Sequence, residues 1–354
     1  MLKLSKDKIS LFLIVIAMFL LIVSSGNCEA KYKFNMAGPE PLWGSLGLVM
    51  QAFASGVRHL SGGDIDITIF PAGEWGENDN ECLQSIQLGN LDLMTTVSTI
   101  NSQYTDALYM FDTPFLFKDL LDEISFTFES PMIKHTPLVT KVLEEASKEA
   151  GFMILSVAPG TTRNIFSNKP IESIDDIKGM KIRTPANPIQ VDAYNFAGLI
   201  ATPLPYQEVF TALQLKNIDA AENSPGSYII MKFYEAAPYF YESGFYYASV
   251  SVMMSMKAWN SLPIAYQNIV RECAVGSMYV FSMGSLGLDK YSTHVIEDKL
   301  AKKVTTIKPE EKLQLRKTVL PKLLDKYAGK IGMEVLEILA EDDEVITNWL
   351  EKNK

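Results

Sequence analysis

The sequence is poor in the residues and motifs on which most enzyme sites are built. It has three histidines among 354 residues and contains no GxGxxG, GxSxG or HExxH motif and no phosphate-binding P-loop. His59, His135 and His294 lie far apart in polar, helix-like segments, so we expect each of them at the surface. No metal site, no cofactor and no catalytic residue is therefore expected.

Cysteine and positive charge are also scarce. Of the three cysteines, Cys82 and Cys273 lie in the body of the chain without a CxxC motif, so we expect two small buried residues rather than a disulfide framework. The chain has 32 basic and 42 acidic residues, a net charge of −10. This balance argues against nucleic-acid binding and against a polybasic membrane patch, since both need a basic face.

Long hydrophobic runs are absent except at the N-terminus. Three lysines within the first eight residues precede a 15-residue apolar run, Ile9–Val23, and small or polar residues follow as far as Ala30. The run is shorter than the roughly 20 residues that span a membrane. It predicts a cleaved secretory signal over residues 1–30 and a periplasmic mature chain with a net charge of −11. An uncleaved anchor and a lipid anchor on Cys28 are the alternatives.

An internal repeat indicates the architecture. Residues 86–92 (IQLGNLD) match residues 213–219 (LQLKNID), and in both places a strand-like run ending in proline and a helical segment precede the match. A short apolar strand then follows. The pattern predicts two strand–helix–strand units, with Gly89 and Lys216-Asn217 ending the helices. We expect an α/β fold of two similar lobes with parallel sheets and a ligand cleft between them.

Residues directly after strands are the candidates for a binding site, because open α/β sheets bind ligands at the carboxyl ends of their strands. Arg183 is the most informative of them, since Thr184-Pro185 ends its short strand at once. A guanidinium at this place suits bidentate capture of a carboxylate. A structural ion pair with a nearby acid such as Asp176 is the alternative.

Four segments resemble the substrate-binding proteins of tripartite ATP-independent periplasmic (TRAP) transporters, in the group with dicarboxylate and sialic-acid binders. They are SGGDIDITIFPAGEWGENDN (61–80), DTPFLF (112–117), SIDDIKGMKIRTP (173–185) and ATPLPYQEVFTALQLKNIDAAEN (201–223). The resemblance extends over essentially the whole chain after the N-terminal segment, and the ordered set of motifs is very specific. The resemblance implies two lobes with strands crossing between them, and a long helix that spans both.

We assign residues 31–158 and 248–288 to lobe I, and residues 159–247 and 289–354 to lobe II. The proline-free stretch from Ile264 to about Leu300 is the candidate for the long helix, although it contains three glycines.

The resemblance also implies site residues. Arg183 matches the arginine that binds the ligand carboxylate, and Arg163 matches a second arginine near the ligand. Asn223 matches the asparagine of a Glu-Asn pair, and Tyr206 matches an aromatic residue that packs on the ligand from a helix start.

Several positions depart from the family pattern and bear on the identity of the ligand. Gly38-Pro39-Glu40 stands where many relatives have histidine, and Thr96 lies in a segment where sialic-acid binders carry glutamate. Glu74, Trp75 and Thr96 of lobe I are expected to contact the part of the ligand that lies beyond its carboxylate. Glu74 and Trp75 could bind hydroxyl groups and stack on a sugar face, with packing at a lobe edge as the alternative. Arginine, asparagine, hydroxyl and aromatic side chains together suit a sugar acid or similar organic acid better than a fatty acid.

The expected function is that of an exported receptor, not an enzyme. It is expected to bind a small carboxylate as a monomer and to deliver it to an integral-membrane TRAP permease, a partner that follows from the resemblance alone. The alternatives are an exported hydrolase acting on a carbohydrate acid, a binding protein for an ATP-driven importer or a sensor, and a purely structural exported protein.

Overall fold

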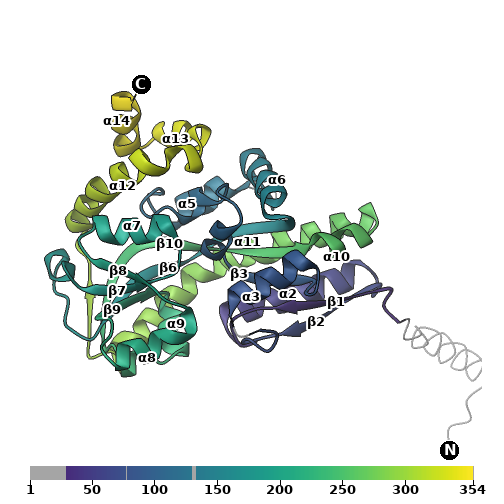
Figure 1. Ribbon diagram of the computed structural model, residues 1–354, viewed down its shortest axis with the longest axis horizontal. Coiled ribbons are helices and arrows are strands. Elements are labelled where there is room, and N and C mark those ends of the chain that lie inside the picture. Colours follow the sequence, from purple (N-terminus) through teal and green to yellow (C-terminus); the bar gives the residue numbers. More distant parts are fainter. Residues whose placement is uncertain (1–28, 77, 130–132, 354) are drawn as a thin grey trace, which may run out of the picture.

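The computed structural model describes residues 29–76, 78–129 and 133–353. The predicted signal segment therefore lies almost entirely outside the described residues. Figure 1 shows two groups of strands and helices side by side, one around β1 to β3 and one around β7 to β9, with longer elements running through both.

The N-terminal half runs from β1 to β6. Its elements are β1 (Tyr32–Ala37), α2 (Ser45–Leu60), β2 (Ile65–Phe70), α3 (Asp79–Leu88), β3 (Leu93–Val97), the 3₁₀ helix η1 (Ser98–Gln103), α4 (Tyr109–Asp112), α5 (Leu120–Thr127), β4 (Phe128–Glu129), β5 (Lys134–His135), α6 (Pro137–Ala150) and β6 (Phe152–Ser167).

The C-terminal half runs from η2 to α14. Its elements are η2 (Ile174–Ile177), β7 (Lys181–Thr184), α7 (Pro188–Phe196), β8 (Ile200–Pro203), η3 (Tyr206–Glu208), α8 (Val209–Gln214), β9 (Ala220–Asn223), α9 (Pro225–Ile230), η4 (Phe233–Glu235), β10 (Tyr239–Ser255), α10 (Met256–Ser261), α11 (Ile264–Val295), the π-helical turn η5 (Ile296–Leu300), β11 (Lys303–Thr306), α12 (Pro309–Ile331), α13 (Met333–Ala340) and α14 (Glu344–Asn353).

The predicted repeat is confirmed. In the first unit, β2 and β3 pair in parallel with β1 on either side, and in the second unit β8 and β9 pair in the same way with β7. The matched segments correspond to β2, α3 and β3 and to β8, α8 and β9. Both helices end where the sequence indicated, because Gly89 (φ 70°) and Lys216 (φ 58°) adopt the left-handed conformation that terminates a helix.

The two units belong to one sheet, which the sequence did not predict. In the described part of the chain the nine-stranded sheet has the order β2-β1-β3-β10-β6-β9-β7-β8, with β11 pairing with β10. The long strands β6 and β10 are antiparallel to each other and to the unit strands that they join. The expectation of parallel sheets therefore holds within each unit and fails between them.

The strand register places the carboxyl ends of the two units opposite each other. Through their common pairing with β10, Val97 at the end of β3 lies level with Ala158 of β6. Asn223 at the end of β9 pairs with Asn164 of the same strand. The strand ends therefore face each other across residues 158–164 of β6, which is where open α/β sheets bind ligands.

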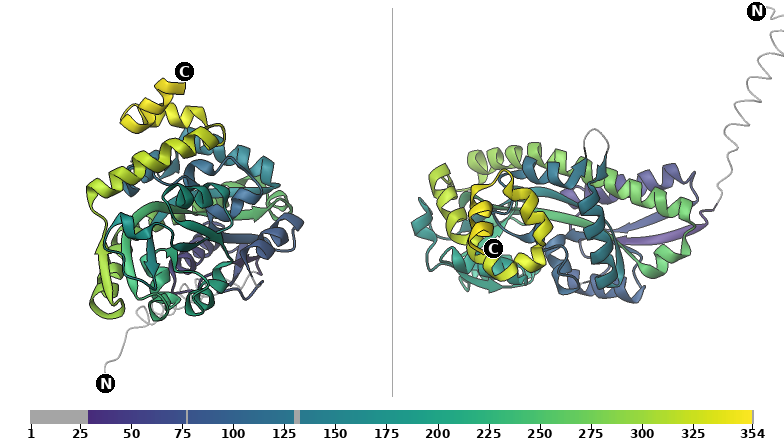
Figure 2. Two further views of the ribbon diagram at one scale, coloured as in Figure 1. Left: turned by 60° about the vertical axis from the view of Figure 1, so that its left-hand side comes forward. Right: turned by 90° about the horizontal axis from the view of Figure 1, so that it is seen from above.

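The predicted long helix is confirmed as α11, which continues into η5 as far as Leu300. It packs along β6 and against α2 of the first unit and α9 beyond the second. In Figure 2 it runs along the length of the molecule, which agrees with a helix that spans both parts.

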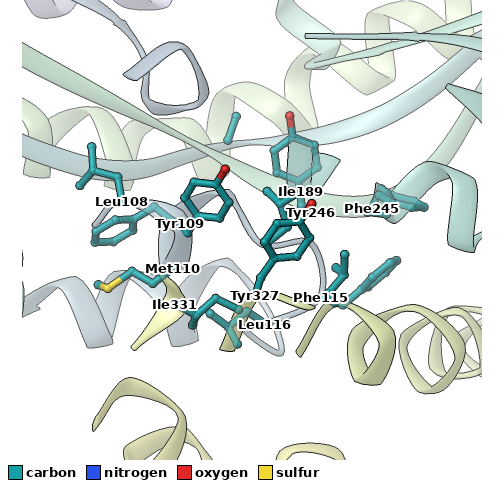
Figure 3. Close-up of a cluster of buried hydrophobic side chains, with 14 of the residues drawn as sticks. Leu108, Tyr109, Met110, Phe115, Leu116, Ile189, Phe245, Tyr246, Tyr327 and Ile331 are labelled. Carbon is teal, nitrogen blue, oxygen red and sulfur yellow. The ribbon is translucent and has the colours of Figure 1, made fainter. Parts of the chain in front are cut away.

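A hydrophobic cluster joins segments from both sides of the molecule. Figure 3 shows Tyr109 and Met110 of α4, Ile189 of α7 and Tyr327 and Ile331 of α12 in one group. All five side chains are at most 4% exposed. The C-terminal helix α12 therefore packs both on α4, which follows the first unit, and on α7, which belongs to the second.

One histidine prediction is wrong. His59 and His294 are exposed, but His135 is 7% exposed, with its Nε2 2.9 Å from the Ser156 hydroxyl. The alternation of strand β5 leaves Lys134 in solvent and turns His135 inward. Burial lowers the pKa of His135 to about 4, so its ring is neutral at pH 7. Cys82 and Cys273 are free, and Cys82 is buried whereas Cys273 is half-buried.

Candidate functional site

A cavity of about 270 Å³ lies between the facing strand ends of the two units. This volume is close to the lower end of small-molecule ligand sites, which start at roughly 300 Å³. Five of the residues predicted from the sequence line it, namely Arg163, Arg183, Asn223, Tyr206 and Thr96. Glu74 and Trp75 do not belong to the lining.

A buried ion pair lies on the second-unit side, and its arginine lines the cavity. Arg163 on β6 donates from Nε and Nη2 to the two carboxylate oxygens of Glu222 on β9, at 2.6 and 3.0 Å. Both residues are at most 6% exposed. Burial acts most strongly on the pKa of Arg163 and lowers it, but the Glu222 carboxylate together with Tyr246 and Tyr194 outweighs burial, and the pKa is raised. The arginine also lies 5.8 Å from the ring centre of Tyr246.

Arg183 is held differently. Its Nε donates to the Leu204 carbonyl oxygen at 2.9 Å, and its Nη1 is 3.8 Å from a Glu222 oxygen. The side chain is 4% exposed, and burial, together with the nearby Arg163, lowers its pKa. Asp176 is not its partner, because that carboxylate accepts backbone N–H groups of its own turn. No other partner of its guanidinium is found among the described residues, so Arg183 keeps donors that can bind a ligand.

Asn223 and Tyr206 flank the arginines. Asn223 ends β9, is 4% exposed, and accepts the Ser224 N–H with its Oδ1 at 2.8 Å. Tyr206 opens η3 directly after a proline, and its ring packs edge-on against Phe233 at 6.2 Å. Burial raises the pKa of Tyr206, so its hydroxyl stays protonated and can donate a hydrogen bond.

The first-unit side carries two carboxylates that the sequence reasoning did not select. Glu40 follows β1, and its Oε2 accepts the Ser45 hydroxyl at 3.1 Å and the Leu46 N–H at 2.9 Å. Asp79 begins α3, and its Oδ2 accepts the Thr96 hydroxyl at 2.8 Å. Burial raises the pKa of both carboxyl groups. The position of Glu40, directly after a strand, was a signal that could have found it.

Glu74 and Trp75 do not contribute to the cavity wall. Glu74 is exposed, and the half-buried Trp75 ring packs edge-on against Phe70 at 5.1 Å. The structure thus places Trp75 in a packing contact.

Neither a metal cluster nor a membrane span is found in the described ranges. Within residues 29–353, apart from Glu77 and residues 130–132, no three His, Cys, Asp or Glu side chains come together as metal ligands would. No helix of the same residues combines the length and the apolar composition needed to cross a membrane.

Known proteins share this architecture. The solved structure of a sugar-acid-binding protein from Advenella mimigardefordensis, in complex with galactonate, superposes with a TM-score of 0.77 at 23% identity and covers 90% of this chain and 99% of that one. A TRAP periplasmic solute-binding protein from Shewanella oneidensis with bound succinate gives a TM-score of 0.76 at 23% identity, covering 87% and 98%. Both likenesses establish the fold.

Sequence relatives lead to the same group. A solute-binding protein of Verminephrobacter eiseniae is 25% identical over 291 residues, 81% of this chain and 83% of the relative. The C4-dicarboxylate-binding periplasmic protein of Shewanella loihica is 24% identical over 317 residues, 89% and 90% of the two chains. The family model described as bacterial extracellular solute-binding protein, family 7, matches residues 45–330. The resemblance seen in the sequence is thereby confirmed, and the chain belongs to this family of TRAP solute-binding proteins.

Proposed function

We propose that this chain is an exported receptor that binds one small organic acid in the cavity and delivers it to the membrane subunits of a TRAP transporter. One observation carries the proposal. Arg183 lines the cavity and is 4% exposed, while Glu222, the acid nearest to it, is already held on both oxygens by Arg163. A buried guanidinium with free donors suits bidentate binding of a carboxylate.

The ligand is a polar carboxylate such as a sugar acid. The remaining wall combines apolar residues such as Ile100, Val250 and Phe281 with amide and hydroxyl side chains, among them Asn78, Thr96, Gln103 and Gln207. The polar side chains can pair with hydroxyl groups of a ligand, which a fatty acid lacks. Relatives of the same fold have been solved with galactonate, D-erythronate and β-D-galacturonate.

Binding closes two lobes over the ligand. The lobes consist of residues 31–158 with 248–288, and of residues 159–247 with 289–354. The proposed boundaries fall within β6, β10 and α11, and the β6–β10 pairing is irregular between Ala248 and Ser249. A ligand that touches both lobes favours the closed state by its higher affinity for that state.

The receptor works outside the cytoplasm as a monomer. Export follows from the N-terminal segment, with cleavage after Ala30, and mass spectrometry of the exported protein would locate the mature N-terminus. The receptor returns its ligand unchanged, so chromatography of the ligand after long incubation distinguishes it from a hydrolase.

A thermal-shift screen of organic and sugar acids tests the binding site. A ligand at about 1,000 times its Kd should stabilise the protein by roughly 4 kcal/mol and raise the melting temperature by several degrees. Arg183→Ala should abolish the shift. The matched control Arg58→Ala removes an exposed arginine far from the cavity lining and should preserve it. A shift that survives Arg183→Ala would refute the proposed site.

A further inference from the structure

The cavity carries opposite charges on its two sides. Arg163 and Arg183 lie on the second-unit side, whereas Glu40 and Asp79 lie on the first-unit side at the starts of α2 and α3. The groups act on each other across the space, since Arg163 acts to lower the pKa of Glu40 and Arg183 acts to lower that of Asp79. No salt bridge closes the gap in the ranges that the structure describes. The cavity is therefore bipolar.

The charge balance does not suit a simple anion. With every group ionised, the two arginines face Glu40, Asp79 and Glu222, so acids already outnumber bases by one. A ligand that brings only a carboxylate adds another negative charge when the cleft closes. Buried charges without partners are strongly unfavourable, and a positive group on the ligand would offset them.

Asp79 has an oxygen available for such a group, because its hydrogen bond uses Oδ2 and among the described residues nothing bonds its Oδ1. Glu40 lines the same cavity, and its carboxylate accepts hydrogen bonds only from Ser45 and Leu46 in the described part of the chain. A helix-capping role would account for the engaged oxygens. It would not account for the placement of both acids opposite the arginines, of which Arg183 is 4% exposed and has further donors without a partner among the described residues.

We propose that the ligand carries a protonated nitrogen as well as its carboxylate, and that Glu40 and Asp79 bind this nitrogen while Arg183 binds the carboxylate. The ligand class is a zwitterionic amino acid or amino-sugar acid. This inference rests on the proposed carboxylate site. Burial raises the pKa of both acids, although Arg163 acts to lower that of Glu40 and Arg183 that of Asp79, and a cationic group bound directly to these carboxylates would favour their charged forms.

Matched pairs of acids that differ only in hydroxyl against amine test the inference. Suitable pairs are gluconate with 2-amino-2-deoxygluconate, 4-hydroxybutyrate with 4-aminobutyrate, and lactate with alanine, each measured by titration calorimetry on the full chain. The amino member of at least one pair should bind, and more tightly than its hydroxy partner. Glu40→Gln and Asp79→Asn should each weaken that binding by about 30-fold or more.

The controls separate binding from folding. Glu351→Gln removes an exposed acid of α14 that does not line the cavity and should leave the affinity unchanged. Glu40 also caps α2, so its variant is accompanied by a urea unfolding curve. Asp79→Asn is the second variant, because an asparagine oxygen can still accept the Thr96 hydrogen bond.

The outcomes distinguish a failure of the zwitterionic ligand from a failure of the proposed receptor function. Binding of hydroxy acids alone, lost in Arg183→Ala and retained or strengthened in Glu40→Gln, would overturn the zwitterion and leave the carboxylate receptor standing. Amino-acid binding that is indifferent to both acid variants would also overturn it. Absence of binding by every acid, with or without a nitrogen, would overturn the proposed function itself.

Discussion

Arg163 and Arg183 share the Glu222 carboxylate unequally. Arg163 holds both oxygens at 2.6 and 3.0 Å, whereas the nearest nitrogen of Arg183 lies 3.8 Å away. The bidentate pair satisfies the buried Glu222 and fixes β6 to β9. Arg183 contributes less to that pair and more to the cavity. The two arginines, similar in the sequence, therefore have different tasks.

This inequality predicts different effects of removing each arginine. Arg163→Met leaves Glu222 without its bidentate partner and should lower the free energy of unfolding of the empty protein by about 3–5 kcal/mol. Arg183→Met loses one hydrogen bond to Leu204 and should lower it by only about 1 kcal/mol. It should nevertheless weaken carboxylate binding by about 30-fold or more. Urea unfolding and calorimetry measure the two effects.

A double variant provides the control. Glu222→Gln added to Arg163→Met removes the unpaired buried charge, so part of the lost stability should return. Equal destabilisation by Arg163→Met and Arg183→Met would contradict the division of tasks.

The sequence predicted one side of the cavity better than the other. Arg183 could be found because a proline ends its strand at once, and the family motifs contain Arg163, Asn223 and Tyr206. Asp79 could not be identified as a cavity residue from the sequence, because an acid in the first turn of a helix is ordinarily explained by capping and the helix dipole. Only the three-dimensional arrangement shows that the start of α3 faces the arginines.

Among the elements, β6 and α11 approach each other closely beside the cavity. The Ser282 hydroxyl of α11 donates to the Pro159 carbonyl oxygen, and the Phe281 ring lies over Gly160. A Cβ at residue 160 would come within 2.2 Å of a Phe281 ring carbon. Gly160 also lies where the register with β10 shifts, between the paired residues Pro159 and Thr161. The glycine is thus required by a contact with a side chain that lines the cavity.

Gly160→Ala should push Phe281 out of position. Phe281 is 8% exposed and packed in the core, so the overpacking should lower the free energy of unfolding by about 1–3 kcal/mol, measured by urea denaturation. The double variant Gly160→Ala with Phe281→Leu should recover part of this loss, because the shorter side chain leaves room for the methyl group. A fully stable Gly160→Ala would contradict the contact.

Gly276→Ala is the matched glycine-to-alanine change on α11, and its effect on the free energy of unfolding should be opposite to that of Gly160→Ala. Gly276 lies inside the helix, and a Cβ there meets nothing within 4 Å among the described residues. Alanine should raise the free energy of unfolding by about 0.5–1 kcal/mol, since glycine is the weaker helix former. Thermal unfolding checks the change, and a loss of stability would show that the glycine serves a close contact.

Local patterns predicted the elements but not how they join. The repeat, the helix ends at Gly89 and Lys216, and the helix from Ile264 all follow from short-range spacing and turn chemistry. The single sheet does not, because β6 and β10 are apolar strands whose partners lie far away in the sequence. An apolar stretch does not indicate which strand will lie beside it. Neither the antiparallel pairing of β6 with β10 nor the strand order could therefore be predicted from the sequence.

The first-unit side and the second unit are connected by buried hydrogen bonds of Asp112 as well as by the packing of α12. Asp112, at the end of α4, accepts the Asn187 side-chain N–H at 3.1 Å and the Ser98 hydroxyl at 2.6 Å. Its backbone oxygen accepts from the Gln190 side chain at 3.2 Å. Asp112 is fully buried, and burial raises its pKa to about 7. The link between the first-unit side and α7 therefore contains a group that titrates near neutral pH.

This pKa predicts a loss of stability as the pH rises. Below about pH 4 the carboxyl is protonated in both the native and the unfolded chain. Between about pH 4 and about pH 7 the unfolded chain loses the proton while the native protein keeps it, so the free energy of unfolding falls. A shift from about 4 to about 7 corresponds to as much as ~4 kcal/mol.

Asp112→Asn removes the titration while keeping the link. Its amide oxygen can accept from Asn187 and its nitrogen can donate to the Ser98 hydroxyl, after rotation of the side chain. We therefore expect the variant to gain stability relative to the parent chain as the pH is raised from 5 to 8, measured by urea unfolding at each pH. Subtracting the two curves of unfolding free energy against pH removes the titration of the groups that both proteins share. The exception is Glu123, because Asp112 itself acts on the pKa of that residue. A difference in unfolding free energy that does not change with pH would contradict the prediction. It would mean that Asp112 ionises in the folded protein at the same pH as in the unfolded chain, and that its contacts with Ser98 and α7 do not depend on its proton.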